Sequence, residues 1–352
     1  MTTDQNILIA LGKAISPNVS MWYGQGAVLQ VEFARLLTYP YSFFVSFPVK
    51  TPDGDLTLLA KIHRKPHMLT LTDALSSDSL KAAGHDEYEM TRKIWNVFEA
   101  EGSPAFTAVQ PLAFLEEWNA ILMKKVDGDA LKMHLITLSM ALRNRKSLAQ
   151  LQKYLSAAAV WLRTFHNRVA EEREEPFPVQ DAIDTMTYVL TRLGSHIDIT
   201  NYRVALTKKM HEISSLQVPV ALLHDDFQYS NILVEKNGRV CVLDYALNHR
   251  SCVYSDLATL LIDPRTRGVQ IWSGGLLIPQ RFIQHLDQTI LDTYFMGKPY
   301  NKPVLEFFCA LAILNKWSAD EDELSSSQGI KTKSIFSQHL RRYYVNLLVK
   351  YI

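Results

Sequence analysis

The chain has 352 residues, of which 47% are hydrophobic, with 37 Lys and Arg residues against 36 Asp and Glu residues. This composition is that of an ordinary globular protein, and a net charge of +1 excludes a general attraction to nucleic acid or to an anionic membrane. Every apolar run is shorter than the roughly 20 residues of a membrane-spanning helix, so we expect no stable membrane insertion. The apolar run near the N-terminus is too short for a signal peptide, and the three cysteines are scattered, so we expect reduced thiols and a cytoplasmic protein.

The first third of the chain predicts a short helix followed by an antiparallel sheet. The helix is expected over residues 6–15. Strands are expected over residues 33–37, 42–49, 56–62 and 120–123. A Pro-Asp-Gly turn at residues 52–54 joins two of these strands, which is typical of antiparallel pairing. Residues 86–98 have apolar side chains at helical spacing and predict a helix between the last two strands.

The rest of the chain has mainly helical periodicity. Helices are expected over residues 151–169, 182–194, 200–214, 280–295, 303–317 and 334–350. Residues 170–178 combine charges with two prolines and predict a loop. Residues 263–268 and 272–275 also predict loops, and residues 318–333, with four consecutive acids and three serines, predict a polar surface loop.

One stretch, residues 220–244, departs from this helical pattern. A short apolar run leads to His224-Asp225-Asp226-Phe227, and Asn231 follows five residues after Asp226. Two β-branched runs then flank Asn237-Gly238, which is the strongest short-range signal for a β-hairpin. The second run ends on Asp244. Polar residues at the ends of strands are typical of a site for chemistry.

The spacing of these residues is similar to that of the protein-kinase catalytic loop H-R-D-L-x-x-x-N and its D-F-G metal motif. His224, Asp226 and Asn231 occupy the loop positions, and Leu243-Asp244-Tyr245 stands in the place of the metal motif. Asp225 replaces the arginine of that pattern, and Ala246 replaces the glycine.

In this form the stretch resembles the aminoglycoside phosphotransferase and choline kinase family, whose loop reads H-x-D-x-x-x-x-N-I-L and whose metal motif is I-D-[FYW]. Residues 254–258 resemble the D-L-A segment of the same family, and Leu162 to His166 its L-x-x-L-H segment. The resemblance implies that Asp226 is the catalytic base and that Asn231 and Asp244 bind Mg²⁺. In this family the first histidine of the loop is structural, which we expect of His224.

The resemblance also assigns roles in the first third of the chain. Lys61, in the middle of its strand, is expected to pair with the ATP phosphates and with a carboxylate on the following helix. Two acids compete for that role. At 100° per residue, Glu87 falls on the apolar face that includes Met90, whereas Glu89 lies roughly 100° away from it. We therefore predict Glu87, with Glu89 as the alternative.

The remaining nucleotide contacts are assigned by the same resemblance. The loop over the phosphates is expected at residues 38–42, ending on Ser42, although it has no glycine signature. Met123 precedes the expected hinge at residues 124–128, where backbone groups would bind adenine. The predicted domains are an ATP-binding lobe (1–123), this hinge, and a catalytic and substrate-binding lobe (129–352).

The sequence therefore predicts an α+β, bilobal, protein-kinase-like fold with ATP and Mg²⁺ bound between the lobes. The predicted function is transfer of the γ-phosphate of ATP to a hydroxyl of a small molecule such as an aminoglycoside, a sugar or an amino alcohol. Two other classes are considered, a nucleotide-binding module without turnover and a protein kinase. The absence of a long activation segment with A-P-E after Asp244 argues against the second.

Overall fold

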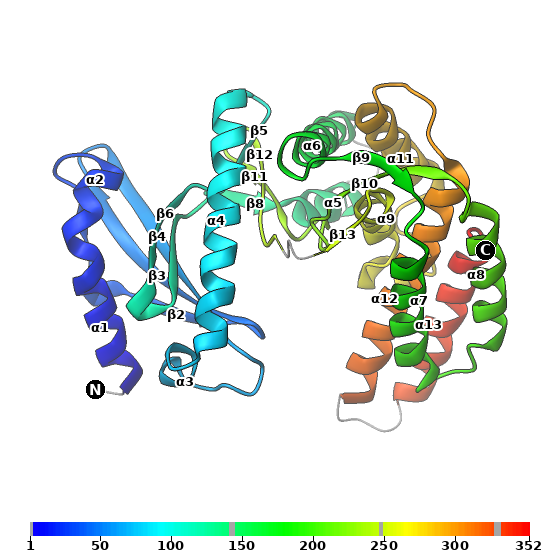
Figure 1. Ribbon diagram of the computed structural model, residues 1–352, viewed down its shortest axis with the longest axis horizontal. Helices are drawn as coiled ribbons and strands as arrows, with labels where there is room; N and C mark the ends of the chain where they lie inside the picture. The colour runs from blue at the N-terminus through cyan, green and yellow to red at the C-terminus, as the bar shows by residue number, and fades with distance from the viewer. Residues whose placement is uncertain (1–2, 141–144, 246–248, 327–331) are drawn as a thin grey trace. The chain divides into compact units, whose positions relative to one another are not determined.

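The structure is a computed structural model that describes residues 3–140, 145–245, 249–326 and 332–352. The chain divides into two compact units, Met1–Asp127 and Gly128–Ile352, here called the N-terminal and the C-terminal unit. The division lies within residues 124–128, for which the sequence predicts a hinge. The α+β class is confirmed, with a curled antiparallel sheet in the first unit and mainly helices in the second (Figure 1).

The N-terminal unit combines an antiparallel sheet with helices. Its elements are α1 (Thr3–Ile15), α2 (Val19–Tyr23), β1 (Val28–Leu29), β2 (Arg35–Thr38), β3 (Ser42–Thr51), β4 (Gly54–His63), α3 (Leu71–Leu75), α4 (Asp78–Glu101), β5 (Phe106–Ala108), β6 (Pro111–Leu115) and β7 (Ala120–Lys124). The predicted strands and helix are present, although the first strand begins later than expected because residues 31–33 form a 3-10 turn. The sequence did not predict α2, α3, β1, β5 and β6.

The sheet of this unit has the order β1-β3-β4-β7-β6, with β2 paired to β3. Alternation along the strands separates its two faces, because successive side chains point to opposite sides. Val45 and Phe47 of β3, with Ala60 and Ile62 of β4, are fully buried in one core with the apolar side chains of α1. Helix α4 contacts β4, β6 and β7, and Figure 1 shows the sheet lying between α1 and α4. Lys61 therefore faces α4.

The C-terminal unit is mainly helical. Its elements are β8 (Gly128–Ala130), α5 (Leu131–Met140), α6 (Arg145–Thr164), a π-helical turn (Phe165–Val169), β9 (Arg173–Pro176), α7 (Val179–Gly194), α8 (Thr200–Ile213), β10 (Gln217–Leu222), β11 (Ile232–Glu235), β12 (Val240–Val242), β13 (Arg250–Cys252), α9 (Tyr254–Ile262), α10 (Gly268–Trp272), α11 (Gln280–Phe295), α12 (Lys302–Ser326) and α13 (Thr332–Leu348). The hairpin predicted around Asn237-Gly238 is β11–β12, with Ile232 opposite Val242.

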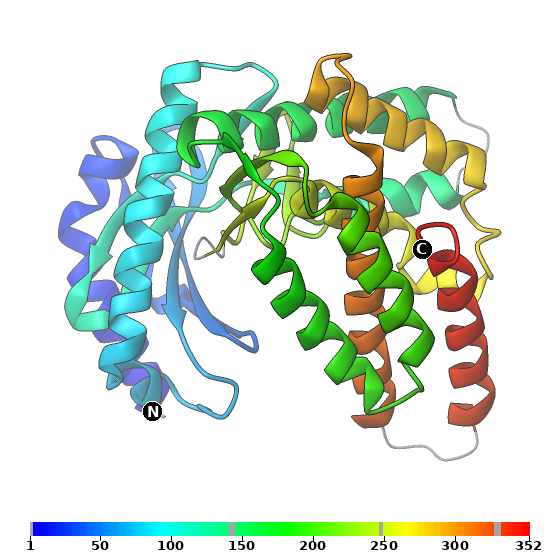
Figure 2. The ribbon, with the colours of Figure 1, turned by 45° about the vertical axis from the view of Figure 1, so that its right-hand side comes forward.

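Helix α12 organises this unit. It contacts α7, α8, α9 and α13, and Figure 2 shows it in orange, with α7 on one side, α13 in red on the other, and α8 crossing in front of it. Trp317 and Phe307 of α12 are almost completely buried. Beside it, β10 pairs antiparallel with both β9 and β13, so the strand that leads into the predicted catalytic loop lies in the middle of a small sheet.

Some predicted loops are wrong. Residues 173–176 form β9, because pairing with β10 uses backbone groups and tolerates charged side chains that face water. Residues 268–272 form α10, so Trp272, the first residue of the loop expected at 272–275, is instead the last residue of that helix. The loop expected over residues 318–333 is a continuation of α12 as far as Ser326, while residues 327–331 lie outside the described part of the chain.

Two acids of this helical segment bind side chains of the last helix, α13. Asp320 accepts a hydrogen bond from Tyr344 at 2.6 Å. Glu321, only 2% exposed, accepts hydrogen bonds from the guanidinium of Arg341 and from the indole of Trp317. Arg341 and Tyr344 of α13 thus bind acids of α12.

Candidate functional site

Lys61 of β4 forms an ion pair with Glu87 of α4, with 2.8 Å between Lys61 Nζ and Glu87 Oε1. The side chains are 11% and 15% exposed, so the pair is largely withdrawn from water. Glu89, the alternative partner, is directed elsewhere and binds Arg92 at 2.6 Å on the exposed side of the helix. The helical phase of the sequence therefore gave the right acid, because only one of two residues 200° apart can face the sheet.

A second side chain contacts the carboxylate of Glu87. His63 Nε2, from the end of β4, lies 2.9 Å from Glu87 Oε2, so each carboxylate oxygen has its own partner. Burial alone would raise the pKa of Glu87, but the charge of Lys61 and the contact with His63 outweigh it and lower the pKa to about 2. Glu87 is therefore ionised at neutral pH and holds the Lys61 ammonium in a fixed place.

The other residues predicted to contact the nucleotide lie on the same sheet. Ser42 is the first residue of β3 and is 7% exposed. The predicted phosphate loop is the tight connection between β2 and β3, where Tyr39 N donates to Ser42 O at 2.8 Å. Met123 lies on β7 opposite Leu59 of β4 and is partly buried. Contacts of Ser42 and Met123 with a nucleotide stay predictions.

In the C-terminal unit, the loop between β10 and β11 brings the two central predicted residues together. Asn231 Nδ2 donates to Asp226 Oδ2 at 2.6 Å and to the Asp226 carbonyl at 3.0 Å. Asn231 is 8% exposed, whereas Asp226 is partly open to solvent. The bond occupies Oδ2 of Asp226 and leaves Oδ1 for another group. A carboxylate held in this way can accept a proton in a fixed direction.

His224 supports this loop through hydrogen bonds, as the sequence predicts. It is fully buried, and burial lowers its pKa despite the carboxylates nearby, so the ring is neutral at physiological pH. The contacts fit one neutral tautomer. Nε2–H donates to the carbonyl of Leu243 at 3.0 Å, and Nδ1 accepts from the backbone N–H of Asp226 at 3.3 Å.

Asp256, at the start of α9, anchors the entry to the loop. Its carboxylate accepts the backbone N–H groups of His224 and Asp225 at 2.8 and 2.9 Å, and it also binds His166 Nε2 at 3.0 Å. Burial would raise the pKa of Asp256, but the hydrogen bond from His166 and the other contacts lower it. The π-helical turn after α6 presents His166, whose Nδ1 lies 2.7 Å from the hydroxyl of Tyr294.

An aromatic cluster packs against the same loop. Trp161 of α6 is fully buried and stacks on Phe165, Phe227 and Tyr245, with ring centroids 5.5–6.0 Å apart. His224 packs edge-on against it at 6.2 Å. Such contacts add stability beyond the area that they bury. The loop therefore lies on a rigid apolar layer, and the tyrosine of Leu243-Asp244-Tyr245 has a packing role.

Asp244 follows β12 and is exposed, with a left-handed backbone (φ 56°). The preceding residue is bonded to Asn231, because Leu243 N donates to Asn231 O at 2.8 Å. Asp244 and Asn231 therefore lie at adjacent positions of the hairpin and supply a carboxylate and an amide oxygen. Mg²⁺ prefers oxygen ligands and keeps several waters, so this pair fits the predicted metal. Ala246, the residue in place of the motif glycine, lies outside the described residues.

Several loop contacts had no signal in the sequence. Asp263, just after α9, accepts the backbone N–H of Tyr229 at 3.1 Å. Arg267 donates to Ser230 Oγ at 3.2 Å and also binds Asp263. Lys316 of α12 donates to Gln228 Oε1 at 2.8 Å. Loop residues 228–230 are thus fixed by three elements that follow them in sequence, and separation along the chain concealed these pairs.

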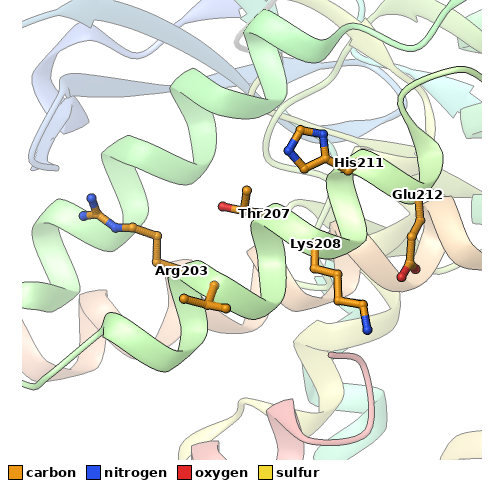
Figure 3. A pocket seen from close by; sticks show the side chains of 6 residues that line it. Arg203, Thr207, Lys208, His211 and Glu212 are labelled. Carbon is orange, nitrogen blue, oxygen red and sulfur yellow. The ribbon is translucent and has the colours of Figure 1, made fainter.

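Two surface hollows of the C-terminal unit are lined by residues outside this loop. Six side chains of α8 line one of them, among them Arg203, Thr207, Lys208, His211 and Glu212 (Figure 3). All come from a single helix, so this hollow is open on its other sides. A second hollow of about 290 Å³ lies among α10, α12 and α13, where Trp272 stacks on Phe336 with centroids 4.0 Å apart.

Two general features complete the description. All three cysteines are free and buried. No helix within the described ranges has both the length and the apolar character needed to cross a membrane.

Comparison with known proteins gives a match to the fold. No family model matches the sequence, and no curated protein matches it significantly. Among solved structures, an ethanolamine kinase of Plasmodium vivax has a TM-score of 0.55 at 12% identity, over 99% of this chain and 90% of that one. A macrolide 2'-phosphotransferase of Brachybacterium faecium has a TM-score of 0.54 at 13% identity, over 97% and 98%. A glucosamine kinase in complex with glucosamine, ADP and inorganic phosphate has a TM-score of 0.52 at 12% identity, over 97% and 84%. The protein-kinase-like fold of small-molecule kinases is therefore confirmed for this chain.

Proposed function

We propose that this protein is a phosphotransferase that moves the γ-phosphate of ATP to a hydroxyl group of a small molecule. The observation that carries the proposal is the braced loop of the C-terminal unit, in which Asn231 holds the carboxylate of Asp226 and the hairpin returns Asp244 beside Asn231. Phosphoryl transfer needs this combination of a directed proton acceptor and oxygen ligands for a metal.

Asp226 is the proposed base. Its Oδ1 accepts or orients the proton of the attacking hydroxyl, while the bond from Asn231 to Oδ2 fixes the direction of the carboxylate. His224 is neutral and supports the loop through its hydrogen bonds to Leu243 and to the backbone of Asp226.

Asn231 and Asp244 would hold Mg²⁺, which when bound neutralises charge on the phosphate groups. Lys61 is proposed to pair with the ATP phosphates, and its ammonium is kept in place by Glu87, whose carboxylate also contacts His63. Ser42 and Met123 are proposed to contact the phosphates and the adenine. The fold shared with kinases of ethanolamine and glucosamine, one of them solved with ADP, supports an adenine nucleotide and a small acceptor.

The test is an assay of nucleoside diphosphate release, which measures ADP from ATP and, in parallel, GDP from GTP. The acceptors are amino sugars, neutral sugars, amino alcohols, aminoglycosides and a mixture of unstructured proteins. We expect ADP release that depends on one class of small acceptor and on Mg²⁺, and that is lost in Asp226→Asn. Binding of Mg·ATP without turnover with any acceptor would favour a nucleotide-binding module instead. Transfer to the protein mixture alone would favour a protein kinase.

A further inference from the structure

Asp225, which directly precedes the proposed base, has a left-handed backbone with φ 64°. For a residue other than glycine this conformation costs roughly 1–2 kcal/mol, and it persists only where neighbouring groups hold it. The φ and ψ angles of Asp225 also set the direction in which Asp226 leaves the loop. Whatever holds Asp225 therefore helps to position Asp226.

Two contacts hold Asp225. Its backbone N–H donates to Asp256 Oδ1 at 2.9 Å. Its side-chain Oδ1 lies 3.1 Å from Nδ1 of His249, which comes just before β13. The second ring nitrogen of His249 binds Asp181 near the start of α7, and the other oxygen of Asp181 binds the hydroxyl of Ser251. Asp225, His249 and Asp181 thus form a bridge from the loop to α7.

The bridge requires a charged imidazole. A neutral ring has only one N–H, so it could donate to one of the two carboxylates and would present a lone pair to the other. Hydrogen bonds to Asp181 and Asp225 raise the pKa of His249 to about 10, so both nitrogens donate at neutral pH. Asp181 and Asp225 are the charged groups that face the ring, one from α7 and one from the loop.

We propose that His249 is a positioning residue of the catalytic loop, whose imidazolium bridges Asp225 to Asp181 and so fixes the direction of Asp226. This inference rests on the phosphotransferase function proposed above. The bridge lies one residue before the base and acts on a strained backbone, so its loss changes the orientation of Asp226 more than the stability of the unit. An exposed ion pair elsewhere contributes only roughly 0–1 kcal/mol to stability.

The test compares His249→Gln with a matched control, His196→Gln. His196 also uses both ring nitrogens, towards Asp322 at 2.8 Å and Ser325 at 3.5 Å, but it bridges to α12 and not to the catalytic loop. We expect kcat to fall by about 10- to 100-fold in His249→Gln, since a small misplacement of a reacting group has such an effect, with KM for ATP nearly unchanged. The control should keep the wild-type kcat.

A third variant, His249→Arg, restores a permanent cation with several N–H donors and should recover part of the lost kcat. Wild-type kcat in His249→Gln, or an equal loss of kcat in His249→Gln and the control, would overturn the proposal. If the wild-type protein consumed no ATP with any acceptor, the proposed function would fail. Hydrogen exchange would still test whether the bridge holds the loop in place. Faster exchange over residues 224–231 in His249→Gln alone supports the bridge, and equal exchange in all proteins overturns it.

Discussion

Replacing Glu87 with glutamine removes the charge that faces Lys61 while keeping nearly the same size. The pair is largely buried, so Lys61 would lose a close carboxylate that is shielded from water. A pKa lowered from 4.5 to about 2 corresponds to about 3 kcal/mol of stability at neutral pH. Breaking a buried ion pair typically costs about 3–5 kcal/mol, which agrees. Glu89 provides the control, because it pairs with Arg92 at an exposed position whose removal should cost about 0–1 kcal/mol.

The assay is urea unfolding followed by tryptophan fluorescence at pH 7. We expect the free energy of unfolding to fall by about 3 kcal/mol in Glu87→Gln and by at most about 1 kcal/mol in Glu89→Gln. The folded-state pKa of Glu87 is lowered, so its contribution is complete above pH 4.5 and is lost as the pH falls towards about 2. The stability difference between wild type and Glu87→Gln should therefore shrink over that range. Equal losses in the two variants, or a difference that acid leaves unchanged, would refute the reasoning.

Three further predictions concern the C-terminal unit. Asp226→Asn should lower kcat by about 100-fold or more with little change in ATP affinity by calorimetry, because only the proton acceptor is lost; a mutant with more than about a tenth of the wild-type kcat would exclude Asp226 as the base. Asp244→Ala should abolish the Mg²⁺-dependent part of ATP binding, and an unchanged calorimetric affinity for Mg·ATP would contradict the metal assignment. Asp256→Ala should destabilise the unit by about 3–5 kcal/mol in thermal unfolding, because it strips a buried anion from His166 and from two loop amides. An unchanged Tm would show that the anchor is dispensable.

The parts of the site that the sequence predicts are those encoded within a few residues of one another. His224, Asp226 and Asn231 share one loop, so their spacing carries the signal directly. The choice of Glu87 over Glu89 is encoded in the phase of a single helix. In both cases local geometry decides, and no knowledge of distant elements is needed.

The unpredicted parts depend on pairs that are far apart in sequence. The sequence predicts a polar loop for the acids of α12, because nothing near these acids in sequence indicates their partners, which include Tyr344 and Arg341 on α13. Similarly, nothing near Gln228 indicates that Lys316 will bind it. Tertiary partners here override the local signal, which assigns unpaired charges to a solvated loop.

The anchor of the catalytic loop also has a consequence for synthesis of the chain. Asp256 lies 32 residues after His224, and Lys316 lies 88 residues after Gln228. At roughly 5–20 residues per second, the ribosome adds Asp256 about 2–6 s after His224. During that interval the loop that carries Phe227 and Tyr229, both fully buried in the finished protein, lacks the carboxylate of Asp256. A nascent chain paused between residues 244 and 256 would contain every predicted site residue of this unit and still present an unanchored, apolar loop to chaperones.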